Sequence, residues 1–505
     1  MTELFVETTC STAELESRRR PRTDIVAEAA DGPGRWICDH GPFRAYERTL
    51  DAAPIGDDRW TVRERTRYRL AIPVWGWLFQ VPIRRALRAR QPGFDYWWAP
   101  PDRLDAHPAT VLGLLAAVQL VDGYLGTVLT QTVTFAADEF GHGNFAQGLV
   151  LGLVRFGVLI TLAAGVVADR RGRRGVLLAT GIAGCLFTAL GGLAPGLWFV
   201  GATQLVARGL STALGVLIVI IAAEEMPARS RAWAASVLVL AAGLGSGMAV
   251  WVLPIADVDP RGWRAVYLAA LLGVLVVVWA GRRLPETTRF TSHIDDAPAT
   301  VHTPDVLERR RRRLVLLASS AFLLAMFLAP ASGFQNDFLK DERGFDATRV
   351  TIFTLVTSTP AGIGVLIGGY MSETTGRRRV AAVGLVSGTG LATAAFFVSG
   401  PALWLFTLGG VVFGALAVPA LAVYGPELFG THDRGRANGV IVVIGVAGSA
   451  VGLLVAGFLS DRWGGERGGG RARLARGPRA GAGRGRTGVP VNPGREREDA
   501  RPRDA

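Results

Sequence analysis

From about residue 109 to residue 460, apolar residues come in runs of about twenty, separated by short stretches of glycine, proline and arginine. A helix of about twenty apolar residues is long enough to cross the hydrocarbon core of a bilayer. The pattern therefore predicts an all-α membrane protein that crosses the bilayer many times. Eleven spans are expected, at residues 110–135, 147–168, 176–194, 197–223, 232–254, 262–281, 313–335, 349–371, 380–399, 402–425 and 438–459.

The first 108 residues have a different pattern, polar and mixed in charge. Within them, an apolar stretch from Leu70 to Ile83 contains two tryptophans and is flanked by arginines. This stretch is too short to cross a bilayer. We expect residues 1–108 to form a cytoplasmic arm in which residues 68–89 either lie at the membrane surface or pack as a small helix on their neighbours.

Arginine placement predicts the orientation of the spans. The loop after the second span carries four arginines between residues 169 and 174, whereas the first loop, residues 136–146, carries two acids and no arginine. Cytoplasmic loops of membrane proteins are enriched in basic residues. We therefore expect a cytoplasmic N-terminus and a location in the plasma membrane.

Composition narrows the possible functions. The 505 residues include 55 Lys and Arg against 42 Asp and Glu, a formal net charge of +13, and the mean hydropathy is +0.30. Lys340 is the only lysine, and no glycine-rich loop precedes it, which excludes a P-loop ATPase. Cys10, Cys38 and Cys185 have neither metal-ligand spacing nor the pattern of a disulfide framework, so free thiols and no metal site are expected.

The sequence also repeats itself, which divides the membrane part into halves at residues 109–284 and 314–460, joined by the loop 285–313. A second pair of repeated motifs follows the fourth and tenth spans. It runs from Glu225 to Arg231 in the first half and from Glu427 to Arg436 in the second. The main repeated positions are Gly165, Asp169, Gly172, Arg173 and Arg174, and then Gly369, Glu373, Gly376, Arg377 and Arg378.

The residues from Gly165 to Arg174, with Asp169 and Arg170 inside them, match the pattern G-x-x-x-D-R-x-G-R-R. In this the chain resembles the major facilitator superfamily. Further resemblance to the superfamily lies in Arg208-Gly209 and Gly262-Trp263-Arg264. The segment Leu284-Pro285-Glu286-Thr287-Thr288-Arg289 is similar to the PE-[ST]-x-R signature of its sugar and organic-acid porters.

The resemblance implies two six-helix bundles, no enzymatic activity, no cofactor beyond a proton as coupling ion, and a monomer. Its partners would be the lipid bilayer and a small-molecule substrate. The loop after the second span would act as a switch, with Gly165 allowing close helix approach and the arginines bridging to carboxylates of the other half. Alternatively, Arg170, Arg173 and Arg174 only enforce the orientation of the spans.

Three charged residues are expected inside the bilayer, where charge is costly unless it is paired. Asp122 lies near the middle of the first span, Arg155 is in the second and Arg208 in the fourth. We expect Asp122 to form an ion pair with Arg208, and we expect protonation of Asp122 to release Arg208. The residues Asp122-Gly123-Tyr124 also resemble the start of a motif in aromatic-acid symporters. A permanently buried ion pair is the alternative. Arg155 could instead bind an anionic substrate. Further polar candidates for the cavity are Gln119, Gln131, Thr132, Gln204, Gln335 and Asn336.

Members of the superfamily usually have twelve spans, and the twelfth is missing here. Residues 461–505 are rich in arginine and glycine and cannot cross a bilayer. After eleven spans this basic tail would lie outside, against the distribution of every other basic loop. We hypothesise that a reading-frame change near residue 465 replaced the twelfth span. The alternative is a disordered arm at residues 466–505 that binds nucleic acid or anionic lipid. It lacks aromatic residues to stack on bases, so no nucleic-acid partner is expected.

The expected function is proton-coupled symport of a small polar metabolite, a sugar or an organic or aromatic acid, by alternating access. A drug/proton antiporter is one alternative, although residues 242–247 lack the G-x-x-x-G-P-x-x-G-G pattern of such antiporters. The other alternative is a membrane nutrient sensor that does not transport.

Overall fold

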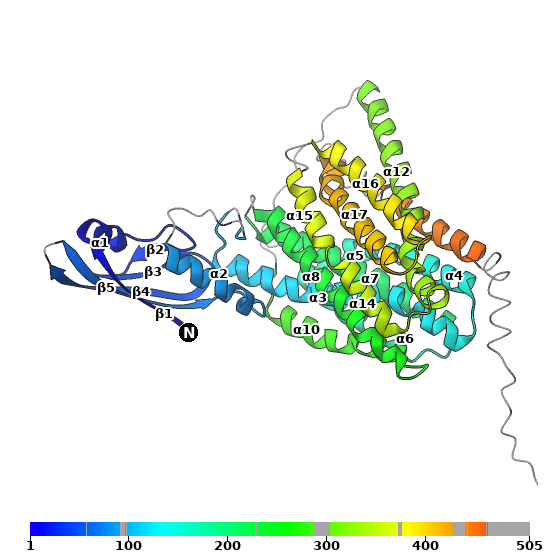
Figure 1. Ribbon diagram of the computed structural model, residues 1–505, viewed down its shortest axis with the longest axis horizontal. Coiled ribbons are helices and arrows are strands. Elements are labelled where there is room, and N and C mark those ends of the chain that lie inside the picture. The colour runs from blue at the N-terminus through cyan, green and yellow to red at the C-terminus, as the bar shows by residue number, and fades with distance from the viewer. Residues whose placement is uncertain are drawn as a thin grey trace, which may run out of the picture. The chain divides into compact units, whose positions relative to one another are not determined.

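A computed structural model describes residues 1–56, 58–90, 96, 98–100, 102–227, 230–286, 304–371, 376–427, 440–441, 443–460 and 462. The N-terminal part, for which the sequence predicted an arm without naming its structure, contains an antiparallel sheet in the strand order β1-β5-β4-β3-β2 (Figure 1). Its strands are β1 (Thr2–Ser11), β2 (Ala27–Ala30), β3 (Arg35–His40), β4 (Phe43–Gly56) and β5 (Arg59–Leu70), and helix α1 (Thr12–Arg19) follows β1.

The apolar stretch that follows the sheet forms helix α2 (Gly76–Ala89). Ile83, Ala86 and Leu87 are buried and pack in one cluster with core residues of the sheet. The other side of the helix exposes Trp77 and Val81, at 70% and 56% of their surface. The helix therefore packs on its neighbours, which is one of the two arrangements expected for residues 68–89. Its exposed apolar side leaves the other arrangement, contact with a membrane surface, as a prediction.

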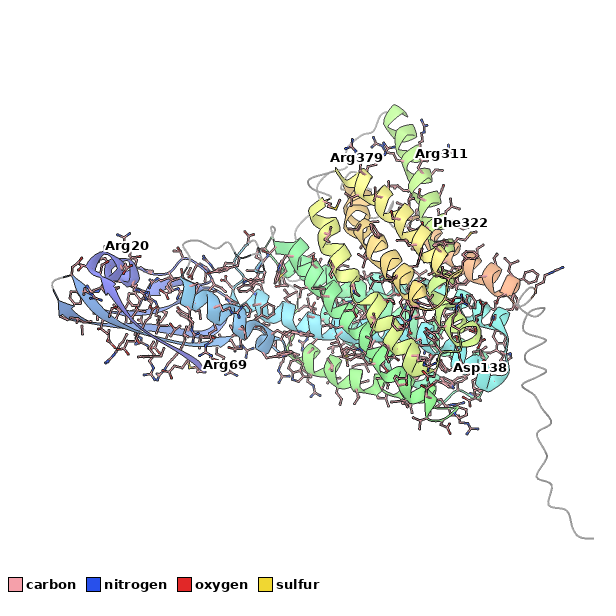
Figure 2. The ribbon with its side chains drawn as sticks, in the orientation of Figure 1. Arg20, Arg69, Asp138, Arg311, Phe322 and Arg379 are labelled. Carbon is pink, nitrogen blue, oxygen red and sulfur yellow. The ribbon has the colours of Figure 1, made fainter. Side chains whose placement is uncertain are left out.

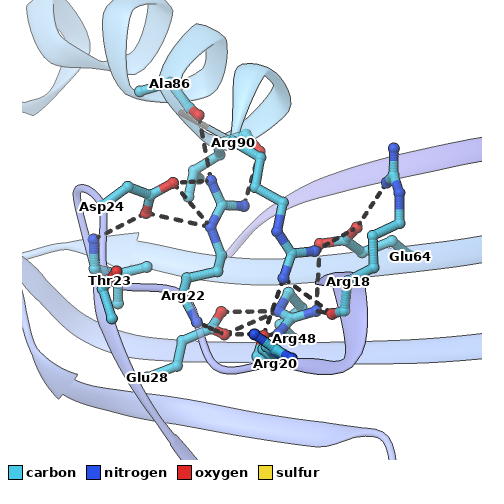
Figure 3. A network of polar contacts seen from close by, with 12 residues as sticks. Arg18, Arg20, Arg22, Thr23, Asp24, Glu28, Arg48, Glu64, Ala86 and Arg90 are labelled. Atoms are coloured by element: carbon cyan, nitrogen blue, oxygen red, sulfur yellow. Dashed lines mark hydrogen bonds and ion pairs between the residues drawn. The ribbon is translucent and has the colours of Figure 1, made fainter. Parts of the chain in front are cut away.

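A network of buried charges fills the space between the sheet and α2 (Figure 3). The Arg48 guanidinium donates to both oxygens of Glu28, the closest contact being 2.7 Å, and both side chains are fully buried. Arg22 pairs with Asp24 at 2.6 Å and donates to the carbonyl of Leu87 on α2 at 2.8 Å. Burial opposes the charged form of Arg22, but the Asp24 carboxylate outweighs it and raises the pKa of Arg22.

The first half of the membrane region follows the sheet. Its helices are α3 (Ala106–Phe140), α4 (Asn144–Val154), η1 (Arg155–Gly157), α5 (Val158–Arg171), α6 (Arg173–Gly191), α7 (Leu197–Glu225), α8 (Arg231–Val252), η3 (Leu253–Asp257), α9 (Trp263–Leu268) and α10 (Ala270–Arg283).

The second half has the same helical character. Its helices are α12 (Pro304–Gly333), α13 (Gln335–Asp337), the π-helix η4 (Phe338–Glu342), α14 (Ala347–Ser358), α15 (Ala361–Met371), α16 (Arg377–Ala395), α17 (Pro401–Glu427) and a last helix at Val443–Ser460. The predicted tail, residues 461–505, lies outside the described residues except for Arg462.

Nine helices of the described chain are long and apolar enough to cross a membrane, against eleven predicted spans. The predicted span 349–371 is divided into α14 and α15 around Pro360, because proline cannot donate a backbone hydrogen bond to a helix. The predicted span 380–399 corresponds to α16, which is not among the nine.

The two halves contact each other at the helix ends that are remote from the sheet, which we call the far end. Asp138 marks this end of α3 (Figure 2) and pairs there with Lys340 of the second half. Gln147 donates to Asp337 at 3.4 Å, and Asp257 accepts from the backbone nitrogen atoms of Ala347 and Thr348 at 2.8 and 2.9 Å. The far end is therefore closed.

Candidate transport site

Asp122 lies in the interior of the first half, where α3 faces α7. The hydroxyl of Ser211 donates to its Oδ1 at 2.6 Å, and the Gln119 side-chain amide donates to its Oδ2 at 2.9 Å. Gly215 leaves room for the carboxylate, since a methyl group there would stand 2.8 Å from Oδ2. The acid predicted for this role is thus held by two neutral donors from two helices.

Arg208 lies on α7, three residues before Ser211, and lines the same cavity as Asp122. The cavity has a volume of about 650 Å³ and is also lined by Thr212 and Ser246. The Arg208 guanidinium donates to the backbone carbonyl of Gly126. Asp122 and Arg208 share a site, but the described contacts include no direct ion pair between them, so the expected pairing is not seen in this conformation.

Arg155 lies where the second span is interrupted, because α4 ends at Val154 and a turn of 3-10 helix replaces the α-helix at Arg155–Gly157. The interruption occurs where this span crosses α7, with Gly157 so close that a methyl group would stand 2.5 Å from the Leu205 carbonyl oxygen. Arg155 is half-buried, and in the described part of the chain no side chain or carbonyl pairs with its guanidinium. Breaks of this kind in membrane helices often mark functional positions.

The other polar candidates do not gather around Asp122. Gln204 is 2% exposed and packs by Gly191, where its side-chain nitrogen has no described partner. Gln335 lines a separate cavity of about 360 Å³ inside the second half. Asn336 donates a side-chain hydrogen bond to Gln131 at the far end. Thr132 bonds the Tyr267 hydroxyl at 3.0 Å. Only Gln119 of this set lines the cavity with Asp122.

The loop between the second and third spans is built around Gly172, whose φ of +93° favours glycine. Gly376 has a φ of +98° at the repeated position, so the internal repeat extends to the backbone. Glu286 accepts from the backbone nitrogen atoms of Arg173 and Arg174 at 2.9 and 3.2 Å, at the start of α6. A carboxylate at a helix N-terminus satisfies donors that the helix leaves free.

The arginines of this loop contact their own half. Arg173 pairs with Glu224 of α7, and Arg174 donates to the Gly281 carbonyl of α10 at 3.0 Å. Glu224 was not among the residues predicted from the sequence, whereas its neighbour Glu225 was, and Glu225 pairs with His107 at 3.2 Å. Among the contacts of the described residues, none joins Arg173 or Arg174 to the second half, so the predicted bridge is not formed here.

Two further expectations concern the same motif. The predicted close helix approach at Gly165 is not seen in this conformation, because among the described residues a methyl group there would have nothing within 4 Å. Arg170 is exposed at the end of α5. The remaining motif residues fall outside the described residues or have side chains outside them, namely Asp169, Arg231, Gly369, Glu373, Arg377, Glu427 and Arg436.

Comparisons with known proteins agree with this geometry. The family profile described as Sugar (and other) transporter matches residues 103–295, and that of the Major Facilitator Superfamily matches residues 317–472. The chain belongs to the major facilitator superfamily. Membership makes it a multi-pass membrane transporter and not an enzyme. The strands β1 to β5 precede the residues that the superfamily profiles match.

Individual members of the superfamily are similar over most of their length. The sialic acid transporter NanX of Escherichia coli (strain K12) is 26% identical over 350 residues, which is 66% of this chain and 78% of NanX. A cis,cis-muconate transport protein of Acinetobacter baylyi is 24% identical over 382 residues, covering 71% of this chain and 89% of that protein.

A solved structure shows the same fold. It is a bacterial homologue of the human lysosomal transporter Spinster, in an inward-facing and unoccupied conformation. It superposes with a TM-score of 0.61 at 19% identity, over 73% of this chain and 86% of that one.

Proposed function

We propose that this protein is a proton-coupled symporter of a small polar metabolite, and that the metabolite is an organic acid. The observation that carries the proposal is the cavity that holds Asp122 together with Arg208, one helix away from Arg155, whose guanidinium has no ion-pair partner among the described residues. Two arginines and one carboxylate in a membrane interior leave an excess of positive charge, which favours an anionic ligand.

Asp122 is the group proposed to carry the proton. An ionised carboxylate in the membrane interior is costly, and its partners here, Ser211 and Gln119, are neutral. Both can rearrange when a proton arrives, since a hydroxyl and an amide can each accept as well as donate. Protonation of Asp122 would leave Arg208 without a negative charge in the shared cavity, so that a substrate carboxylate takes its place. Binding of the proton and of the acid would then favour each other.

The names of two relatives support the choice of an acid, because they refer to transport of sialic acid and of cis,cis-muconate.

In the proposed topology the protein lies in the plasma membrane, with the sheet and the N-terminus on the cytoplasmic side. Two bundles of six helices, of which the second bundle is incomplete, rock against each other. The far end is then the outer side, and its closure describes an inward-facing state.

Reconstituted vesicles test this proposal with a panel of organic acids and sugars. We expect uptake of an organic-acid substrate to carry protons into the vesicles and so to alkalinise the external medium. In Asp122→Asn this pH signal should vanish, while exchange of unlabelled for labelled substrate should continue. Retained exchange would show that the variant folds and binds. Asp259→Asn, in the loop near α9, is the matched control and should keep both activities.

Arg155→Gln separates the substrate role from the proton role. We expect it to raise KM for the acid with a smaller effect on kcat, because it removes a binding contact and leaves Asp122 in place. Proton movement that is unaltered in Asp122→Asn would refute the coupling role. Acidification instead of alkalinisation would indicate the antiporter. No flux of any compound would favour a sensor, for which the folded sheet is the supporting observation.

A further inference from the structure

A second cavity lies outside the transport site, between the N-terminal sheet and the membrane helices. It has a volume of about 280 Å³ and is lined by α2, by described residues between 98 and 104, and by the N-terminal halves of α3 and α8. Its walls are formed mainly by large apolar side chains, among them Trp75, Phe79, Trp98, Leu112 and Trp233.

The lining is apolar almost throughout. Among the described residues of the lining, Arg103 is the only charged one, and its guanidinium donates to the backbone carbonyls of Asp24 and Thr23, in the segment between α1 and β2, at 2.9 and 2.5 Å. A polar ligand in this cavity would lose its hydrogen bonds to water and find no replacement. The apolar lining therefore favours a hydrocarbon ligand.

The cavity lies at the depth of one leaflet of the bilayer. Along α3, its wall residue Ala116 is about 9 Å and Ala109 about 20 Å from Asp122, at 1.5 Å per residue. With Asp122 near the midplane and a hydrocarbon half-thickness of about 15 Å, the cavity extends from the hydrocarbon to the headgroup level on the side of the sheet.

The cavity also opens towards the lipid. Leu78 of α2 and Leu240 and Leu244 of α8 line it, and yet they expose 46%, 61% and 48% of their surface. Leu240 and Leu244 lie on a helix long and apolar enough to cross a membrane, where exposed leucines are expected to meet lipid chains. With Leu78 of α2 beside them, they would form the rim between the cavity and the bilayer. A hydrocarbon chain can enter here without crossing water.

Helix α2 adds positive charge beside this rim. Arg84, Arg85 and Arg88 are exposed on the last turns of the helix that supplies Leu78 and Phe79 to the cavity. Trp77 and Val81 are exposed on its earlier turns. A helix with exposed tryptophan and arginine is typical of a segment bound to the interface of an anionic membrane.

We propose that this cavity binds one acyl chain of an anionic phospholipid from the leaflet on the side of the sheet, with its headgroup near the arginines of α2. In the proposed orientation this is the cytoplasmic leaflet, but the binding itself does not depend on the direction of transport. The occupant is a lipid of the membrane and not a transported substrate, because Asp122 and Arg208 line a different cavity.

The test uses the full chain in vesicles of phosphatidylglycerol that carries a photoactivatable group on its acyl chain, followed by peptide mapping of the adducts. We expect adducts on peptides around Leu78 and Leu240. Val237→Trp, which fills the cavity from α8, should remove most of them, whereas Val239→Trp, exposed to lipid on the same helix, should not. Leu78→Trp fills it from the opposite wall if the first variant fails to fold.

Headgroup selection is tested separately. Each of Arg84→Gln, Arg85→Gln and Arg88→Gln should lower the labelling by phosphatidylglycerol about fivefold, the effect of one basic residue near an anionic surface. Arg63→Gln on β5 should not lower it. Adducts spread evenly over the helices, or equal labelling in both tryptophan variants, would overturn the pocket. Equal labelling by phosphatidylcholine would overturn the choice of an anionic lipid.

Discussion

Asn336 of the second half donates its side-chain amide to Gln131 of the first half, at 2.9 Å to the backbone carbonyl and 3.1 Å to the side-chain oxygen. Asn336 is 3% exposed, so its side of the contact is almost fully buried. It lies at the far end, where the Asp138–Lys340 and Gln147–Asp337 pairs also join the halves. Alternating access requires these contacts to break when this end opens.

A cross-link between these two positions should trap the closed far end. We expect Gln131→Cys with Asn336→Cys, in a chain whose three native cysteines are serine, to form a disulfide on oxidation. Transport should stop and return after reduction. Gln131→Cys with Ser332→Cys is the control, because Ser332 is exposed one turn earlier on α12. Full transport by the oxidised first pair would show that this end does not need to open.

The buried pair of Arg48 and Glu28 makes a prediction about stability. Arg48→Met leaves the Glu28 carboxylate without its cation in a fully buried position, which costs about 3 kcal/mol. Amide hydrogens of β4 that exchange by unfolding of the sheet should then exchange about a hundredfold faster in the full-length protein.

The matched control for that experiment is Arg63→Met. Arg63 pairs with Glu7 at 3.0 Å on the exposed surface of the same sheet. Exposed pairs contribute at most about 1 kcal/mol, so exchange in β4 should change little. If both variants accelerated exchange equally, burial of the Arg48 network would not be the source of its effect.

Cys38 is predicted to react slowly with thiol reagents. Burial, reinforced by the negative charges of Asp105, Asp39 and Glu28, raises the pKa of the Cys38 thiol to about 11. Only the thiolate reacts, so in a variant with Cys10 and Cys185 replaced by serine the rate of alkylation should rise about tenfold per pH unit until about pH 11. Asp105→Asn should accelerate the reaction at pH 8. A rate that levels off near pH 9 would contradict the shift.

Glu286 is predicted to stabilise the start of α6. Glu286→Ala removes the acceptor for the backbone nitrogen atoms of Arg173 and Arg174, at a cost of about 1 kcal/mol by analogy with helix caps. The thermal unfolding midpoint of the purified protein should fall, and hydrogen exchange at the start of α6 should increase. Glu286→Gln retains an acceptor and should lose less. Equal losses in the two variants would point to the charge of Glu286 rather than to its hydrogen bonds.

The sequence predicted the membrane region well because lipid imposes one simple pattern on every span. It did not predict the N-terminal sheet, where strand alternation is present but polar residues share the inward positions with apolar ones. On β5, for example, Val62 and Tyr68 are buried together with Glu64 and Thr66. Glu64 and Arg48 are buried because they pair with each other, at 3.6 Å, and a pairing between strands is not visible in one strand's pattern.

The transport site shows a similar limit. The sequence identified Asp122, Arg208 and Arg155 because charges are conspicuous in apolar helices. It did not identify Ser211, which lies one turn after Arg208 and supplies the shortest contact to Asp122. Spacing along α7 could have suggested that they share a face, but a serine in a membrane helix is common and gives no signal of its own.

The first and fifth spans touch through glycines. A methyl group on Gly123 would overlap the Ala242 carbonyl, and one on Gly245 would overlap the Leu120 carbonyl. Any change of the first or second base in a glycine codon either adds a side chain or ends the chain. Natural variants should therefore be rarer at these two codons than at that of Gly243, where nothing lies within 4 Å.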